Sequence, residues 1–291
     1  MSGPVMMGHL ILERLARKEL PRIPEPDLIM SDPQKVEAFM ESGREDGILA
    51  FLYLFHSLQV APIIREGDRV LDLACGPGNQ LAQIARLNPR AHFIGVDASA
   101  NMLERAGITL ARSGIANVQL RHGDIRDLHD FAPRSFDGVM CTMSLHHLPD
   151  IASLQRAMAA AARVLKPNGG IYIADFGRLR RRGTQEFFAN DNAAYQLPEF
   201  TRDYLNSLRA AFSFDELSAA IAQLNAAVTM HSTALAPFMI VAKSKPRREL
   251  DSVTQQSIKN IFSQMNAEQQ RNFVVLSRWF RSAGLALPVN F

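Results

Sequence analysis

Two glycines after an apolar run form the first candidate site in this sequence. Residues 70–74 are apolar except for Asp72, and they lead directly into a turn that contains Gly76 and Gly78. The pattern predicts a buried parallel strand that ends in a tight turn, followed by a helix over 80–87. Glycines let a ligand approach the backbone closely, and a helix N-terminus attracts a carboxylate or a phosphate. The turn is therefore a candidate cradle for an anionic group.

Asp97 is the second candidate, because it ends the apolar run 91–96 and lies 19 residues past Gly78. Nucleotide-binding strand–helix–strand units place an acid about 20 residues beyond the glycine turn, where its carboxylate accepts the ribose hydroxyls. The alternative is that Asp97 only caps the following helix. Since the acid and the turn are in register, we favour the ribose role.

The residue at position 81 separates two classes of cofactor. A dinucleotide site has the pattern Gly-x-Gly-x-x-Gly, in which the last glycine allows close packing of the helix under a pyrophosphate. In this chain Leu81 occupies the place of that glycine. A nicotinamide-dependent oxidoreductase is therefore disfavoured.

The stretch instead resembles motif I of the class I S-adenosylmethionine (SAM)-dependent methyltransferases. The resemblance continues in order through Gly95–Ser99, Gly123–Ile125, Phe136–Val139 and Val164–Gly170. It implies an α/β fold with a Rossmann-like, seven-stranded, mostly parallel sheet. The last strand is expected to be antiparallel and helices to cover both faces.

The resemblance also implies a site for SAM and its product S-adenosylhomocysteine. Asp124 is expected to accept a hydrogen bond from the adenine amino group, which can only donate usefully, and the Ile125 backbone to contact the ring. Met102 is expected to pack on the adenine, although a methionine at helical spacing is often simply core. The full expected set is Asp72, Ala74, Gly76, Gly78, Asn79, Asp97, Ala98, Met102, Asp124, Ile125 and Cys141.

A histidine pair and one acid are the candidate catalytic residues. His146 and His147 follow the apolar run 136–143, and Asp175 follows the run 171–174. In some O-methyltransferases that this chain resembles, a histidine here and the acid after strand five act as a base and its partner. A neutral imidazole suits a hydroxyl nucleophile, and general base catalysis contributes ~10²–10⁴-fold. The alternative is that one histidine packs the short helix and Asp175 only orients backbone.

The sequence divides into three parts. Residues 1–65 are expected to form an arm and a helical lid, 66–244 the SAM-binding domain with a substrate cap at 177–212, and 245–291 a C-terminal helical extension. In the first part we expect a short helix over Leu12–Leu20 and a proline-rich extended arm. Two helices should then lie between Gln34 and Ile64, broken near Gly43 or Gly47.

Polar and aromatic residues of the lid and the cap are candidates to meet the substrate. Arg44, Glu45, Asp46 and His56 could reach inward, or the first three could form a solvated face. The cap opens with a basic cluster over Arg178–Arg182. It is either a solvated face or a site that attracts a carboxylate, a phosphate, nucleic acid or an acidic carrier protein. Its aromatic residues favour an apolar or ring-bearing substrate, but a helical cap also needs a core.

Composition excludes several classes of protein. The 291 residues are 47% hydrophobic and 21% charged with a net charge of +3, which is ordinary for one nucleotide-binding domain with additions. The two cysteines, Cys75 and Cys141, suggest neither disulfides nor a metal site, so we expect no metal and a cytoplasmic location. The N-terminus lacks the pattern of a signal peptide, and the apolar stretch Ile48–Ile64 is shorter than a membrane span.

The expected function is transfer of a methyl group from SAM to a small molecule, with an oxygen acceptor favoured over nitrogen. The alternatives are an RNA or protein methyltransferase and a SAM-binding enzyme of other chemistry. Many base N-methylating enzymes carry Asn/Asp-Pro-Pro-Tyr/Phe after strand four, whereas this chain has Thr142–Leu145 there. Nucleic acid and membrane are disfavoured as partners, and the N- or C-terminal helices are candidates for a homodimer interface.

Overall fold

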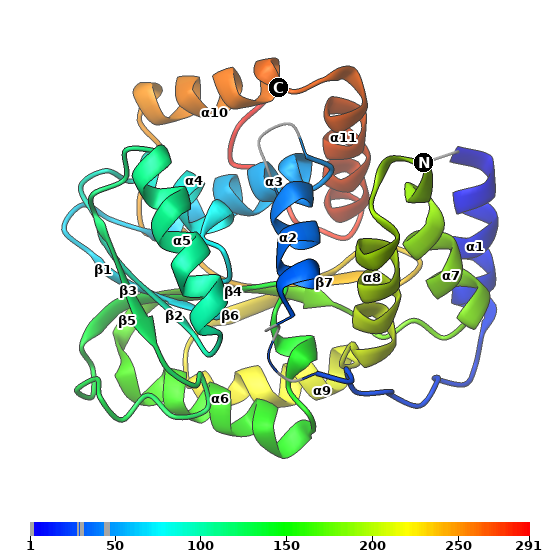
Figure 1. The fold of residues 1–291 in the computed structure, drawn as a ribbon, viewed down its shortest axis with the longest axis horizontal. Coiled ribbons are helices and arrows are strands. Elements are labelled where there is room, and N and C mark those ends of the chain that lie inside the picture. Colours follow the sequence, from blue (N-terminus) through cyan, green and yellow to red (C-terminus); the bar gives the residue numbers. More distant parts are fainter. Residues whose placement is uncertain (1–2, 28, 30–31, 44–46) are drawn as a thin grey trace.

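A computed structural model describes residues 3–27, 29, 32–43 and 47–291 (Figure 1). Its centre is a seven-stranded sheet in the order β3-β2-β1-β4-β5-β7-β6. All neighbouring strands are parallel except β7, which is antiparallel to both β5 and β6. This confirms the predicted sheet. The strands are β1 (Arg69–Leu73), β2 (His92–Asp97), β3 (Val118–His122), β4 (Phe136–Thr142), β5 (Leu165–Phe176), β6 (Val228–Ser232) and β7 (Met239–Ser244).

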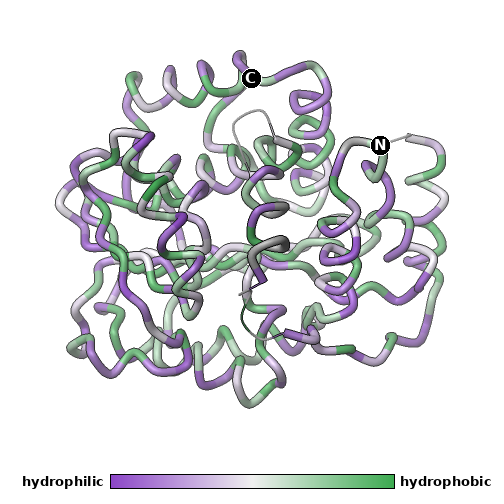
Figure 2. Tube along the Cα trace, in the orientation of Figure 1, coloured by the Kyte–Doolittle hydropathy of each residue, from purple (hydrophilic) through white to green (hydrophobic). Residues whose placement is uncertain are grey.

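Helices cover both faces of the sheet (Figure 1). One layer contains α3 (Ala50–Val60), α4 (Asn79–Leu87), α5 (Ala100–Arg112), α10 (Ser252–Gln264) and α11 (Ala267–Arg281), and the other contains α6 (Ile151–Val164) and α9 (Phe214–Ile221). Successive side chains of a strand point to opposite faces, so Val70 belongs to one apolar cluster and Leu71 and Leu73 to the other. Figure 2 shows the strands as a hydrophobic centre between these layers.

The glycine turn connects β1 to α4. Gly76 and Gly78 have φ values of 55° and 78°, which an L residue adopts only with strain, and Gly78 is the cap residue of α4. A Cβ atom on Gly78 would lie 3.1 Å from the Cβ of Ala106 in α5. Glycine at this position therefore allows α5 to pack close beside the turn.

The predicted helix over Leu12–Leu20 was wrong in its bounds, because the N-terminal helix lies earlier in the chain. Helix α1 spans Gly3–Leu15, and the chain beyond it is extended. The extended form is held by tertiary contacts. The Arg180 guanidinium donates to the Ala16 carbonyl at 3.2 Å, and the Ile23 amide donates to the Arg209 carbonyl at 3.0 Å.

Two helices follow with a break between them, as predicted. Helix α2 spans Pro33–Ser42 and α3 begins at Ala50. The predicted inward residues Arg44, Glu45 and Asp46 lie outside the described residues. His56 is fully buried in α3, where its Nδ1 lies 2.7 Å from the Tyr172 hydroxyl in the core.

The cap and the C-terminal helices pack against the domain. The cap consists of α7 (Arg182–Asn190), a short turn η3 (Ala193–Tyr195) and α8 (Pro198–Ala210). Arg178, the first residue of the basic cluster, is buried in an ion pair with Glu216. Helix α11 packs on α3, with the rings of Phe280 and Phe55 stacked at 5.0 Å. Within the described part of the chain, every helix is too short or too polar to span a lipid bilayer.

Candidate active site

A cavity of about 310 Å³ lies at the carboxyl ends of the central strands. The sheet order reverses between β1 and β4, and ligands of open α/β sheets bind outside such a switch point. One end of the cavity is lined by the glycine turn and the ends of β2 and β3, the other by the His146-His147 turn and aromatic side chains. The volume is in the range of small-molecule sites.

The structure brings most of the predicted residues to this cavity. The wall contains Ala74, Gly76, Asp97, Ala98, Met102, Asp124, Ile125, His146 and His147. Five others lie behind the lining: Asp72, Gly78, Asn79, Cys141 and Asp175. Asp72 and Cys141 are buried within β1 and β4, and burial raises the pKa of both side chains well above their ordinary values.

Asp97 is held rigidly beside the glycine turn. Its Oδ2 accepts a hydrogen bond from the Gly76 amide and its Oδ1 one from the Ser99 amide, both at 2.8 Å. Burial raises the pKa of Asp97, and these backbone hydrogen bonds only partly offset the effect. Asp97 also lines the cavity, and a carboxylate has about four acceptor sites, so it can still accept a hydroxyl donor there.

Asn79 is the first residue of α4 and has a buried donor. Its side chain is hydrogen-bonded to the Tyr53 hydroxyl of α3, and this bond partly offsets the rise in the pKa of Tyr53 that burial causes. Both groups lie beside Gly43. A Cβ atom built on Gly43 would be 2.6 Å from the Tyr53 hydroxyl and 2.7 Å from Asn79 Nδ2. Sequence reasoning missed Tyr53, which lines the cavity.

Asp124 is paired with a cavity residue that sequence reasoning also missed. The Arg126 side chain donates to both carboxylate oxygens at 2.6–3.0 Å, and the Arg126 amide donates to Oδ1 at 2.8 Å. The Arg126 hydrogen bonds hold the pKa of Asp124 below its usual value. Asp124 is therefore ionised near neutral pH, with part of its acceptor capacity already used.

His146 and Asp175 form a buried pair. His146 Nδ1 lies 2.6 Å from Asp175 Oδ1, and the His146 amide donates to Asp175 Oδ2 at 2.9 Å. We assign the proton to Nδ1 because a carboxylate can only accept there, which leaves the lone pair on Nε2. Burial lowers the pKa of His146, but the charge and the hydrogen bond of Asp175, together with the charges of Glu25 and Asp203, outweigh burial and raise it. The ring is thus oriented and made more basic.

The family of the chain is shown by its match to a family model described as a methyltransferase domain, which covers residues 64–262. This match includes more than half of the chain. The chain belongs to the methyltransferase family. It is a class I SAM-dependent methyltransferase domain, as the sequence motifs predicted, and SAM is its cofactor.

Two curated relatives resemble the methyltransferase domain. A ubiquinone biosynthesis O-methyltransferase from Paracidovorax citrulli is 29% identical over 150 residues, which are 52% of this chain and 60% of that protein. A demethylmenaquinone methyltransferase from Listeria monocytogenes is 31% identical over 147 residues, which are 50% of this chain and 60% of that protein. The matched part thus spans less than two thirds of either relative.

Solved structures share the fold of this methyltransferase. A SAM-dependent methyltransferase from Aquifex aeolicus aligns with a TM-score of 0.53 at 17% identity, over 73% of this chain and 97% of that one. An O-methyltransferase family protein from Burkholderia thailandensis aligns with a TM-score of 0.54 at 18% identity, over 75% of this chain and 61% of that one. At these identities the likeness concerns the fold alone.

The residues at the first end of the methyltransferase cavity fit SAM. The glycine turn and the N-terminus of α4, whose cap residue Gly78 makes no side-chain cap hydrogen bond, suit a carboxylate, as in an amino-acid tail. The Asp97 carboxylate suits two ribose hydroxyls. Met102 and Ile125 offer apolar surface to a purine ring beside Asp124.

The other end of the cavity is aromatic. Phe176 ends β5, and its ring centroid lies 5.4 Å from that of Tyr204 in α8 and 5.9 Å from that of Phe238. Phe238 in turn stacks on Trp279 of α11 at 5.6 Å. The cap and the C-terminal helix therefore both contribute to this wall, which the sequence alone did not indicate for Trp279.

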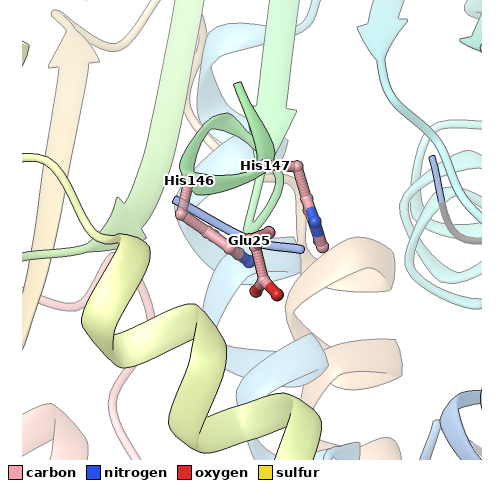
Figure 3. A group of neighbouring side chains, drawn as sticks. All are labelled: Glu25, His146 and His147. Atoms are coloured by element: carbon pink, nitrogen blue, oxygen red, sulfur yellow. The ribbon is translucent and has the colours of Figure 1, made fainter. Parts of the chain in front are cut away.

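The N-terminal arm adds one further polar group to this end. Glu25 is 6% exposed, and Ser207 of α8 donates to its Oε1 at 2.8 Å. Its carboxylate lies next to both histidines of the short turn η2 (Leu145–His147), as Figure 3 shows. Nothing near Glu25 in the sequence indicates this contact, because it arises from packing between distant segments.

Proposed function

We propose that this methyltransferase acts on an apolar, ring-bearing small molecule and methylates a hydroxyl oxygen of it. The observation that carries the proposal is the buried His146–Asp175 pair at the aromatic end of the cavity, with Nε2 as the remaining basic atom. A base at this position is useful for a hydroxyl nucleophile, whose proton must leave, and less so for an amine.

We propose that the cofactor is oriented by the residues that fit it, namely Asn79 and the glycine turn, Asp97, and the apolar side chains near Asp124. When bound, SAM supplies a methyl carbon whose bond to sulfur breaks with the electron pair remaining on sulfur as the acceptor oxygen attacks. Holding the two reactants in one cavity removes much of the entropic cost of their encounter.

The base is proposed to be His146. Its Nε2 takes the proton of the acceptor hydroxyl, and Asp175 stabilises the imidazolium that forms. Asp175 touches no cavity surface, so it acts as a positioning residue through His146. His147 adjoins the same space, with its ring centroid 4.4 Å from that of His146.

The acceptor class is proposed from the wall of the cavity and from the relatives. Aromatic side chains stack on flat apolar molecules, and Phe176, Tyr204 and Phe238 surround this end. The two relatives are named for ubiquinone biosynthesis and for demethylmenaquinone, which supports a ring-bearing acceptor. An RNA or protein acceptor has no comparable support among these observations.

The test is to measure SAM affinity and turnover separately on a panel of phenolic and amine acceptors. We expect phenolic acceptors to be methylated. His146→Ala should then reduce turnover by about 10²–10⁴-fold while SAM affinity stays nearly unchanged. His92→Ala, at the exposed start of β2, is the matched control. Methylation of amines only, or normal turnover of the His146 variant, would contradict the proposal.

A further inference from the structure

Three potential metal ligands converge at the acceptor end of the cavity. Glu25, His146 and His147 each offer one ligand atom, and these atoms all lie within 4.8 Å of one another (Figure 3). We propose that the three residues bind one divalent transition-metal ion of the Zn²⁺ type. The bound ion would compete with the acceptor hydroxyl for the lone pair of His146. This second part rests on the proposed function, whereas the binding site itself does not.

The ligand set is suited to such an ion. Two imidazoles and one carboxylate are the ligands of several zinc sites that keep a fourth position open. Bonds of about 2.0–2.2 Å in tetrahedral geometry place ligand atoms roughly 3.5 Å apart. The present spacing therefore needs side-chain movements on the order of 1 Å. His146 and His147 line the cavity, so the open position would face the acceptor space.

Each buried ligand is oriented by a second side chain. Asp175 accepts the Nδ1 proton of His146, which turns the Nε2 lone pair away from the core, and Ser207 holds Glu25. Metal-binding histidines almost always donate their other ring N–H to such a partner. His146 and Glu25 are 3% and 6% exposed.

The N-terminal arm is fixed to the turn that carries both histidines. The Arg22 guanidinium donates to the carbonyl oxygens of His146 and Pro149 at 2.8 and 2.6 Å, and also to that of Leu148. On its other side it donates to the Ala210 carbonyl at 2.6 Å and covers the Phe212 ring at 4.1 Å. Glu25 is three residues further on, so its place beside the histidines is determined before any ion arrives.

The consequence for catalysis is a competition. An ion on Nε2 occupies the atom that would take the acceptor proton, so a metal-loaded chain lacks its base. We expect Zn²⁺ to raise the apparent KM of the acceptor and a chelator to leave turnover intact. Loss of turnover on chelation would overturn the competition.

The test of the site uses the full chain freed of metal with a chelator and then titrated with Zn²⁺. Calorimetry and metal analysis after gel filtration should both give one ion per chain. Loss of a residue that only orients a metal ligand weakens metal binding by about 10–100-fold. Loss of a ligand itself, in Glu25→Gln or His147→Ala, should therefore weaken Zn²⁺ binding by more than about tenfold. With Co²⁺, the visible absorption of the bound ion should change in the His147 variant.

The control is His129→Ala. His129 is an exposed histidine whose ring nitrogens lie 2.7 Å from Asp127 and 3.1 Å from Asp130, so it is the competing surface site. Its loss should not change the affinity. Unchanged binding in the Glu25 and His147 variants, or loss of binding in the His129 variant, would overturn the site. Melting temperature and SAM affinity confirm that each variant is folded. Because the titration uses no acceptor, its result is independent of the proposed methyl transfer.

Discussion

At the scale of single residues, the acids of this methyltransferase differ according to the groups around them. Asp97 accepts two backbone hydrogen bonds at the cavity wall, Asp124 is held by Arg126, and Asp175 supports His146 from behind. Three aspartates are thus proposed for three roles: Asp97 accepts the ribose hydroxyls, Asp124 accepts the adenine amino group, and Asp175 positions His146. Burial and hydrogen-bond partners, rather than residue type, distinguish the three.

Replacing Asp97 tests the ribose assignment. Asp97→Ala removes the acceptor of two hydroxyls, and hydrogen bonds to a charged group are worth about 1.5–3 kcal/mol each, so SAM affinity should fall by at least tenfold. Calorimetric titration measures the loss, and Asp97→Asn should show a smaller one because it keeps one acceptor oxygen. Asp127→Ala, at an exposed acid, is the control. Equal SAM affinity in the wild type and Asp97→Ala would remove the assignment.

His56 predicts a pH dependence of stability. Burial lowers its pKa to about 3, with a small opposing effect of Asp175. The unfolded chain, with a histidine pKa near 6.5, therefore binds the proton first as the pH falls. The stability contributed by neutral His56 is complete above pH 6.5 and is lost between pH 6.5 and about pH 3, at up to about 1.4 kcal/mol per unit.

The measurement compares the free energy of unfolding of the wild type with that of His56→Gln, which does not titrate. On lowering the pH from 6.5 to 5, the wild type should lose about 1.6 kcal/mol of this free energy relative to the variant. His92→Ala, which removes an exposed histidine, should keep the wild-type slope. A wild type and a His56 variant with parallel pH curves would show that His56 titrates normally in the folded protein.

At the scale of elements, the C-terminal helices are bound to the domain by large apolar side chains. Phe280 of α11 is fully buried and stacks on Phe55 of α3, while Trp279 reaches the cavity wall from the same helix. The extension is therefore part of the structure that surrounds the proposed acceptor. Its loss should affect both stability and the acceptor end.

Phe280→Ala tests how strongly α11 is bound. The substitution leaves a cavity between α11 and α3, and burial of this kind is worth about 3–5 kcal/mol in the free energy of unfolding. Denaturant titration measures the cost. Val253→Ala in α10, where the side chain is 75% exposed, should change stability by less than about 0.5 kcal/mol. Similar costs for the two variants would mean that α11 contributes little to the fold.

At the scale of the whole molecule, the cavity joins the sheet, the cap, the arm and α11. Ligand binding at such a junction stabilises all of these elements together against unfolding. S-Adenosylhomocysteine at about a hundred times its Kd should stabilise the protein by about 2.7 kcal/mol, visible as a higher Tm. NAD at the same concentration should leave the Tm unchanged, because Leu81 occupies the position of the third dinucleotide glycine. A larger shift with NAD would contradict the cofactor assignment.

The sequence by itself determined the sheet, the glycine turn and the family, because each of these features depends on residues that are contiguous in the chain. Strand runs, the turn glycines and the acid that ends β2 depend on local spacing, which does not change when the chain folds. The predicted helix over Leu12–Leu20 failed beyond Leu15. There the Ala16 carbonyl accepts a hydrogen bond from Arg180, and the arm that follows is bound to distant segments through Arg22 and Ile23.

Only the tertiary structure decided which residues meet at the acceptor end. Glu25 and Trp279 reach the histidines and the cavity wall through packing between segments far apart in the chain. A lone glutamate in a proline-rich arm has no local pattern that could indicate such a place. Glu25 is placed by the hydrogen bonds of Arg22 in the same arm, and it contacts the Ser207 hydroxyl and the His146-His147 turn. These groups come together only in the folded chain.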